Sequence, residues 1–463
     1  MASSKTNLST RGDVFATPTS KIPLLDVVCD LWHPETNPGG YVSLGVAENT
    51  LMHEEVIEHM TKNFGVDSHS LTYGDGFSGS HRLRDTIARF VNRNFNPHEP
   101  VTKNQLLITS GVGQAIEVSG FSICDKGDGV LLARPYYGNF PIDLGYRVEA
   151  KTIGVSFEET DPFGLETIKV YEKALADAQA QGIRVKALLL CNPHNPLGRC
   201  YPRQVIEAYM KFCQKHSLHL ISDEIYALSV WRNPEFPDAP EFTSVLAINP
   251  DGIIDRNLIH VFWGMSKDFG SNGIRLGCVI SRNEAFIRAC EANSYFTCPS
   301  SLSDLATSRI LSDDAFVESL TKTNRLRLAD NYIMTSKFLE RHQIPYKKGS
   351  NAGLFIWVDL FAPIQAQVST ALKKQGGIHS EKPFEDLQLK LYTTLLKHRI
   401  FLALGADFGG DIPGWFRIVF AHEKTYLQLG LDRMIEAVEV FRRELETGVG
   451  VDTVATKLED VEV

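Results

Sequence analysis

Short apolar runs alternate with helical stretches between about residues 100 and 280. The runs are rich in Val, Ile and Leu and lie at 105–111, 129–135, 185–193, 218–224, 258–264 and 277–281. Continuous apolar runs without polar alternation are typical of strands that are covered on both faces, as in a largely parallel sheet between helices. The pattern therefore predicts an α/β domain.

The pattern changes after about residue 335. Strand-like segments at 353–360 and 415–421 are combined with a helix from about 385 to 398 and a long amphipathic helix at about 424–446, which predicts a smaller α+β domain. We expect the polar segment 367–383, which contains Gly376 and Gly377, to be a loose loop. The tail, 448–463, has no clear periodicity and is expected to be frayed.

The first 30 residues are polar and then mixed in character. Pro18 and Pro23 interrupt any long helix there, which indicates an arm that lies on another surface, a partner subunit being one candidate. We therefore expect three parts. Residues 1–50 form the arm and part of the smaller domain, 51–335 the large α/β domain, and 336–463 the smaller domain with its frayed tail.

Composition and charge exclude several classes of protein. The 463 residues are 43% hydrophobic and 22% charged, as in ordinary soluble domains. A net charge of −9 without a basic stripe argues against a nucleic-acid partner. No stretch reaches the roughly 18 to 20 apolar residues that span a membrane, and the N-terminus lacks the apolar core of a secretory signal. We expect a soluble, cytoplasmic protein with neither a membrane nor a nucleic-acid partner.

The cysteines do not indicate a metal site. None of the eight forms a CxxC pair, and several lie in apolar runs, where cysteine behaves as a small hydrophobe. We expect neither a bound metal nor a disulfide framework.

Polar residues at the ends of the predicted strands are the candidates for chemistry, because ligands bind at the carboxyl ends of strands in open α/β sheets. At the first end, 108–117, a strand runs into Gly111 and Gly113 and then a helix, so that backbone N–H groups can meet a phosphate. A plain tight turn is the alternative interpretation. The second end, 191–201, contains two Asn-Pro pairs, whose asparagine side chains are available as donors.

The two remaining strand ends carry ionisable side chains. Asp223 comes directly after a buried strand and needs a cationic partner if it is inside, unless it caps the next helix. Lys267 follows another apolar strand and precedes Arg275, with glycines between them. A lone lysine in such a place is usually solvated, but a phosphate loop, an amide, a carboxylate and a lysine at four strand ends indicate one shared site.

Together these four ends resemble the pyridoxal-phosphate enzymes of fold type I, in the class I/II aminotransferase family, and most closely its 1-aminocyclopropane-1-carboxylate (ACC) synthase-like branch. The resemblance covers about residues 40 to 440, and its most specific motifs are SKxxGxxGxRxG at 266–277, NPxNPLG at 192–198 and SDExY at 222–226. It implies the fold type I transferase architecture of a mostly parallel sheet between helices plus a smaller α+β domain. It also implies a pyridoxal 5'-phosphate cofactor and a small amino-acid substrate.

By this resemblance, each candidate residue has a role towards the cofactor ring. Lys267 is the lysine that binds the cofactor as a Schiff base and then acts as the base at Cα. Asp223 would keep the pyridinium nitrogen protonated, and Asn195 and Tyr226 would hydrogen-bond the phenolic oxygen. Tyr137 would stack on the ring and is favoured over Tyr136.

The resemblance also implies groups for the two anions of the complex. The phosphate would be bound by Arg275, by the hydroxyl of Ser266 and by the backbone of Gly111, Val112 and Gly113. Arg417 matches the arginine that binds the substrate's α-carboxylate, the alternative being a surface ion pair. Tyr73 matches a tyrosine that reaches the cofactor phosphate of a neighbouring subunit, which implies a homodimer with active sites at its interface.

Two departures from the family pattern concern the phosphate. Many relatives carry a serine three residues before the lysine, where this chain has Gly264, and a Thr or Ser in the phosphate loop, where it has Val112 and Gly113. Each missing hydroxyl removes a hydrogen bond of roughly 0.5 to 1.5 kcal/mol net. Cofactor binding is therefore expected to be weaker, or the donors to come from elsewhere.

The reaction type is left open by fold and cofactor. The segment 42–51 resembles the GLAENQL segment of ACC synthases, which places Glu48 near the substrate, where that branch handles the side chain of S-adenosylmethionine; the alternative is a glutamate at a helix start. ACC synthases carry an N-terminal tyrosine that touches the substrate, whereas residues 10–35 contain no tyrosine.

Our leading hypothesis is a biosynthetic lyase that cleaves a carbon–sulfur bond of an amino acid or amino-acid-derived metabolite after α-deprotonation. The close alternative is an aminotransferase that transfers an α-amino group to a keto acid. A binding protein that has lost the chemistry is disfavoured, because Lys267, Asp223 and Arg417 are all present.

Overall fold

The computed structural model describes residues 7–16, 24–374 and 382–447. Pro18, Pro23, Gly376, Gly377 and the predicted frayed tail lie outside the described residues. Within the described ranges, no helix is both long and apolar enough to cross a membrane.

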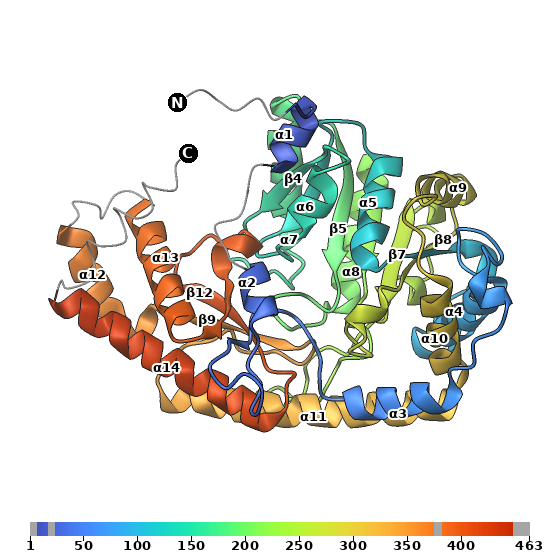
Figure 1. The fold of residues 1–463 in the computed structure, drawn as a ribbon. Helices are drawn as coiled ribbons and strands as arrows, with labels where there is room; N and C mark the ends of the chain where they lie inside the picture. Colours follow the sequence, from blue (N-terminus) through green and yellow to red (C-terminus); the bar gives the residue numbers. More distant parts are fainter. Residues whose placement is uncertain (1–6, 17–23, 375–381, 448–463) are drawn as a thin grey trace.

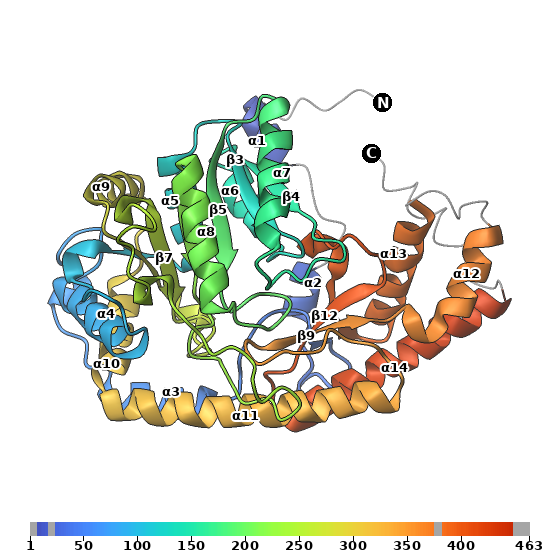
Figure 2. The ribbon, with the colours of Figure 1, turned by 180° about the vertical axis from the view of Figure 1, so that it is seen from behind.

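A seven-stranded sheet forms the centre of the large part of the molecule (Figures 1 and 2). Its order is β2-β8-β7-β6-β5-β3-β4, and all neighbouring strands are parallel except β8, which is antiparallel to both of its neighbours. The strands are β2 Leu106–Thr109, β3 Gly129–Ala133, β4 Lys151–Val155, β5 Val185–Cys191, β6 His219–Asp223, β7 Ile259–Gly264 and β8 Gly277–Ser281. The α/β prediction with a mostly parallel sheet is confirmed.

Helices cover both faces of this sheet, and this explains why its strands are continuously apolar. In β5, Leu188 and Leu190 join the hydrophobic core under α4, α7 and α8, whereas Ala187 and Leu189 join the core under α5, α6 and α9. The helices of this part are α3 His53–Asn63, α4 His81–Asn94, α5 Val112–Ile123, α6 Phe140–Gly145, α7 Thr167–Ala180, α8 Arg203–His216, α9 Glu284–Asn293, α10 Ser301–Ser312 and α11 Asp314–Arg341. The first view faces α5 and α6, and the second faces α7 and α8 (Figures 1 and 2).

The apolar-run criterion missed one strand, β4. It lies at the edge of the sheet next to β3, and its residues are exposed or half-buried up to Val155. An edge strand needs less apolar sequence than a central strand because part of it faces solvent.

A smaller three-stranded antiparallel sheet lies beside the large one. Its order is β11-β12-β9, with β9 Phe355–Asp359, β11 Ala403–Leu404 and β12 Trp415–Val419. Its helices are α12 Gln365–Lys374, α13 Lys382–Lys397 and α14 Lys424–Thr447. A parallel pair of β1 Val42–Ser43 with β10 Ile400–Phe401 joins the N-terminal segment to this part.

The prediction of a loose loop over 367–383 is wrong for its first half, because Gln365–Lys374 forms α12. Val368 and Leu372, four residues apart on one helical face, are buried in the core that α13 and α14 share. Their packing outweighs the polar composition of the segment.

The predicted domain division has no linker at its second boundary. Helix α11 continues through residue 335 and runs along the lower edge beneath both sheets in both views (Figures 1 and 2). The division at residues 50 and 335 stays a prediction.

The N-terminal arm contains two short helices, α1 Thr10–Ala16 and α2 Leu24–Cys29. The ring of Phe15 packs edge-on against Tyr146, directly after α6, with the ring centroids 5.2 Å apart. This part of the arm therefore lies on the large part of its own chain.

Candidate active site

The four chemically unusual strand ends meet at one cavity of about 300 Å³. It opens where β5, β6 and β7 end and α5 begins, since the carboxyl ends of parallel strands share one edge of a sheet. The residues predicted from sequence that line it are Val112, Gly113, Tyr137, Asn195, Asp223, Tyr226, Ser266, Lys267 and Arg275.

Lys267 lies three residues after the end of β7 and points into this cavity. Its Nζ donates a hydrogen bond to the carbonyl oxygen of Ala47 at 2.5 Å. Burial, together with the positive charge of Arg417, lowers the pKa of Lys267 to about 8, against the opposing effects of Glu48 and Asp223. A substantial fraction of this amine is therefore neutral near physiological pH, as a nucleophile or base requires.

Asp223 is the last residue of β6 and is only 4% exposed. Its Oδ1 accepts a hydrogen bond from the backbone N–H of Ile225 at 3.2 Å, and no ion pair to it is formed by the described residues. Burial raises its pKa to about 7. The alternative of a helix cap is wrong, because turns follow β6 directly. A buried carboxyl that lines a cavity and forms no ion pair with the described residues fits a cationic ligand atom.

Arg417 approaches the same cavity from β12 of the smaller sheet. It is 4% exposed, and it donates from Nη1 to Asn195 Oδ1 at 2.9 Å and from Nη2 to the carbonyl oxygen of Gly45 at 2.6 Å. Its guanidinium lies 4.7 Å from the ring centroid of Phe408. Both of these hydrogen-bond partners are neutral and Arg417 is buried, so the alternative of a surface ion pair is wrong. This buried cation is suited to an anionic ligand group.

Glycines allow Arg275 to approach the first turn of α5. Gly111, at φ 81°, precedes the helix, and a Cβ there would lie 2.6 Å from Arg275 Nη2. A Cβ on Gly277 would lie 2.7 Å from the carbonyl carbon of Gly111. The N–H groups of the first turn and the guanidinium therefore meet at one place, which is the chemistry of an anion site.

Gly264 is enclosed too tightly for the serine that the resemblance to the family implies at this position. A Cβ on Gly264 would lie 2.7 Å from the carbonyl oxygen of Leu276. The packing of β8 against β7 therefore excludes this hydroxyl.

Two of the candidate tyrosines, Tyr137 and Tyr226, lie at the cavity, and Tyr136 does not. Tyr137 lines the cavity and its hydroxyl accepts a hydrogen bond from Asn139 Nδ2 at 3.0 Å, whereas Tyr136 packs against Gly409 away from it. Burial, then the charge of Asp143, raises the pKa of Tyr137 to about 12. Tyr226 is buried beside Phe355, and burial raises the pKa of its phenol as well. Both phenols therefore remain neutral hydrogen-bonding groups.

One N-terminal segment, Gly45–Glu48, contacts the site at three points. Besides the carbonyl groups of Gly45 and Ala47, the Oε1 of Glu48 accepts a hydrogen bond from Asn272 Nδ2 at 2.8 Å. The pairing of β1 with β10 fixes the start of this segment on the smaller sheet. Glu48 is not in a helix, since α3 begins only at His53, so the alternative of a helix-start glutamate is wrong.

Tyr73 is not brought to this cavity. It is 85% exposed, and its ring packs on Phe77 with the centroids 6.1 Å apart.

Three polar side chains that line the cavity were not predicted from the sequence: Asn139, Asp143 and Asn272. Asn272 lies inside the 266–277 motif, so the motif could have identified it as a candidate. Asp143 lies in the segment FPIDLG, which offers no pattern that separates a site carboxyl from a solvated one.

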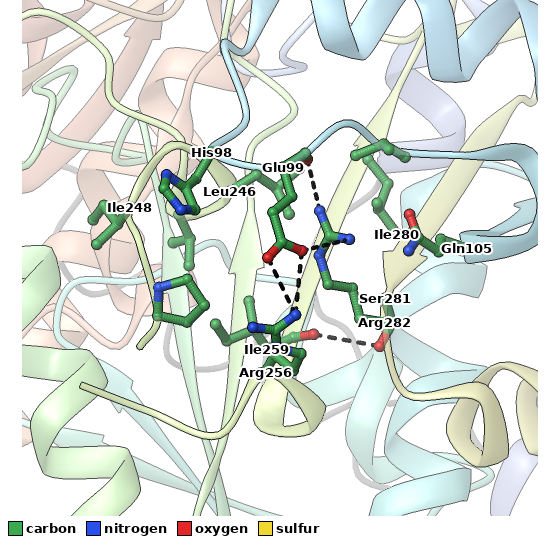
Figure 3. A pocket seen from close by; sticks show the side chains of 13 residues that line it. His98, Glu99, Gln105, Leu246, Ile248, Arg256, Ile259, Ile280, Ser281 and Arg282 are labelled. Carbon is green, nitrogen blue, oxygen red and sulfur yellow. Dashed lines mark hydrogen bonds and ion pairs between the residues drawn. The ribbon is translucent and has the colours of Figure 1, made fainter. Parts of the chain in front are cut away.

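A second hollow lies at the opposite edge of the sheet, where β7 begins and β8 ends (Figure 3). Its volume of about 30 Å³ has room for one or two water molecules. Glu99 bridges Arg256 and Arg282 there, at 3.2 Å from each. The charged side chains of this hollow thus pair with one another. The candidate active site is therefore the cavity that Lys267 lines.

Comparison with known proteins agrees with this geometry. Residues 40–434 match the family "Aminotransferase class I and II". The probable aminotransferase tcpI of Claviceps purpurea is 33% identical over 403 residues, which cover 86% of this chain and 89% of that protein. The 1-aminocyclopropane-1-carboxylate synthase of Glycine max is 30% identical, over 87% of this chain and 81% of its own.

The fold agrees with that of solved aminotransferases. The aspartate aminotransferase of Thermus thermophilus with maleate superimposes with a TM-score of 0.67 at 20% identity, over 93% of this chain and 99% of that one. The chain therefore belongs to the class I and II aminotransferase family, whose members are enzymes that use pyridoxal phosphate.

Proposed function

We propose that this protein is a lyase that breaks a carbon–sulfur bond of an amino acid after deprotonation at Cα. The observation that carries the proposal is the Glu48 carboxylate, held by Asn272 near the amine of Lys267. Transamination can proceed with Lys267 as the only proton carrier. Loss of a side-chain substituent benefits from a second group that holds this substituent.

The charges around the cavity fit the cofactor. Asp223, which is buried and forms no ion pair among the residues that the structure describes, would pair with the ring nitrogen. Arg275 with Ser266 and the first turn of α5 would bind the phosphate. Asn195 and Tyr226 would hydrogen-bond the phenolic oxygen. When bound, the cofactor supplies an electron sink that stabilises negative charge at Cα.

The remaining charged residues would bind the substrate. Arg417 is buried and pairs with no acidic side chain among the described residues, so it would bind the α-carboxylate and thereby orient the Cα–H bond towards Lys267. Tyr137 would cover the ring from the side of α6.

Lys267 would remove the α-proton, and Glu48 would contact the side chain that bears the sulfur. The electron pair of the C–S bond then leaves with the sulfur, which is released as a thiol after taking up a proton. Hydrolysis of the remaining fragment gives ammonia and a keto acid. For an S-alkylcysteine, the sum is substrate plus water to thiol, ammonia and keto acid.

The second candidate is an aminotransferase. It is favoured by the relative tcpI, which is named a probable aminotransferase. An assay of the purified holoenzyme with S-alkylcysteines, S-adenosylmethionine and common amino acids separates the two functions. Thiol, ammonia and keto acid in equal amounts support the lyase. Keto acid with conversion of the cofactor to its amine form, reversed by a second keto acid, would establish the aminotransferase instead.

We also propose a homodimer whose interface includes an exposed aromatic cluster of Tyr73, Phe77, Tyr295 and Phe296. Phe296 is 90% exposed and packs on Tyr295, which in turn packs on Phe77. Exposed aromatic groups of this kind are typical of protein interfaces. A second copy of the chain that covers the cluster would bring Tyr73 to the partner's phosphate site.

The lowered pKa of Lys267 predicts the pH dependence of cofactor uptake. Only the neutral amine attacks the aldehyde, so the rate of covalent uptake by the apo-protein should rise from pH 6.5 and level off above the pKa of about 8. Stopped-flow absorbance measures this rate. Lys267→Ala is the control and should show no covalent uptake. A rate that keeps rising to pH 10 would contradict the lowered pKa.

Removal of the Glu48 carboxylate should separate the two reactions. Glu48→Ala is expected to lower kcat/KM for thiol release by about tenfold or more, the value of a hydrogen bond to a charged group. Asn272→Ala leaves the carboxylate in place but unsupported, so a smaller loss is expected. With free alanine as the substrate, the rate at which the cofactor is converted to its amine form should stay within about twofold of the wild-type rate in both variants. Equal losses in both reactions would remove the case for a lyase-specific role.

The aromatic cluster should be needed for dimerisation. Phe296→Asp is expected to shift the protein from dimer to monomer in sedimentation and to weaken cofactor binding. Tyr73→Phe should leave the dimer intact and raise the Kd for cofactor about threefold to tenfold by loss of one hydrogen bond. A dimer that persists in Phe296→Asp would place the interface elsewhere.

A further inference from the structure

Asp143 is a carboxyl of the cofactor cavity that none of the roles above uses. It lies on α6 and lines the cavity together with Asp223 and Tyr137. Its Oδ2 is buried, and none of the described residues forms a hydrogen bond with it. Such an orphaned polar atom is costly in a folded protein and is typical of a site that awaits a ligand.

The carboxyl of Asp143 faces the phosphate loop at the position where a side chain is missing. A Cβ on Gly113 would lie 3.5 Å from Asp143 Oδ1 and 3.8 Å from Oδ2. Gly113 is in the first turn of α5, and it is one of the two loop positions at which the resemblance to the family implies a hydroxyl residue. The absence of this side chain leaves the Asp143 carboxyl next to the anion-binding end of α5.

The surroundings of Asp143 favour its neutral form. Burial, then the negative charges of Asp223 on β6 and Glu117 on α5, raise its pKa to about 7. Arg147 is 3.4 Å from Glu117 and so compensates that acid, and Tyr137 on the adjoining segment is neutral. On β4, which packs against α6, Lys151 is exposed. A carboxylic acid that is kept neutral by its site can donate a hydrogen bond.

We propose that the protonated Asp143 carboxyl donates a hydrogen bond to the phosphate group of the bound cofactor and thereby replaces the hydroxyl that the loop lacks at Val112 and Gly113. The carboxyl reaches the loop from α6 instead of from the loop itself. Cofactor affinity then depends on pH. The donor is present below the pKa of Asp143, and above it a carboxylate beside the phosphate repels the ligand. This inference rests on the proposed placement of the phosphate and is independent of the reaction.

The test measures the Kd of pyridoxamine 5'-phosphate for the apo-protein by calorimetry between pH 6 and 8.5. This ligand forms no bond to Lys267, so neither turnover nor Schiff-base formation enters the result. Asp143→Ala should raise the Kd at pH 6 by roughly tenfold, whereas Asp143→Asn keeps an N–H donor and should stay within about threefold of the wild type. For each protein, the ratio of the Kd at pH 8.5 to the Kd at pH 6 is compared. This ratio should be about ten times larger for the wild type than for Asp143→Asn.

A restored hydroxyl provides the matched gain-of-function variant. Gly113→Ser is sterically possible, because its Cβ would meet no atom closer than 3.5 Å. In the Asp143→Ala background it should recover most of the lost affinity. Pyridoxamine lacks the phosphate. At pH 6 it should bind equally to the wild type, to Asp143→Ala, to Asp143→Asn and to the double variant with Gly113→Ser.

Several results would overturn the inference. These are an unchanged or lower Kd in Asp143→Ala, the same pH dependence in Asp143→Asn as in the wild type, and an equal loss for pyridoxamine. The variant Arg275→Met separates this failure from a failure of the proposed phosphate placement. If Arg275→Met leaves the Kd of pyridoxamine 5'-phosphate unchanged, the phosphate is bound elsewhere. If it weakens binding while the Asp143 variants do not, only the role of Asp143 is wrong.

Discussion

Asp223 and Lys267 line one cavity, and the buried Arg417 is hydrogen-bonded to Asn195, which lines it too. Within the described part of the chain, no ion pair joins these three ionisable side chains. Each burial costs free energy that only the surrounding fold can offset. Neutral groups hold Lys267 and Arg417 in place, namely the carbonyl oxygens of Gly45 and Ala47 and the amide of Asn195. The carboxyl of Asp223 and the guanidinium of Arg417 therefore remain available for ligand groups of opposite charge.

The segment Gly45–Glu48 makes this arrangement depend on both parts of the molecule. It starts from a strand pair on the smaller sheet and contacts Lys267 and Asn272, which follow β7 of the large sheet. Arg417 spans the same junction in the other direction, from β12 to Asn195 after β5. A change in the packing of the two sheets would thus alter the positions of Lys267, Arg417 and Glu48 at the same time.

At the end of the cavity formed by the first turn of α5, close packing decides which side chains can be present. Gly264 and Gly277 lack room for a side chain because β8 packs closely on β7 and on the start of α5. This close approach brings Arg275 to the first turn of α5 but excludes a hydroxyl at residue 264. At Gly113, by contrast, the space is open, and it is the carboxyl of Asp143 that faces it. The two departures from the family pattern therefore have different physical origins.

The sequence by itself determined the central strands and the residues at their ends, because a strand covered on both faces must be continuously apolar and the change to polar residues marks its end. It also determined the family, through the motifs around Lys267, Asn195 and Asp223. Only the tertiary structure decided that β4 is an edge strand, that α12 is a helix and that Glu48 is held by Asn272. The orphaned carboxyl of Asp143 likewise emerged only there. The physical reason is the same in each case: exposure, burial and hydrogen-bond partners depend on residues distant in the chain, which a local pattern does not contain.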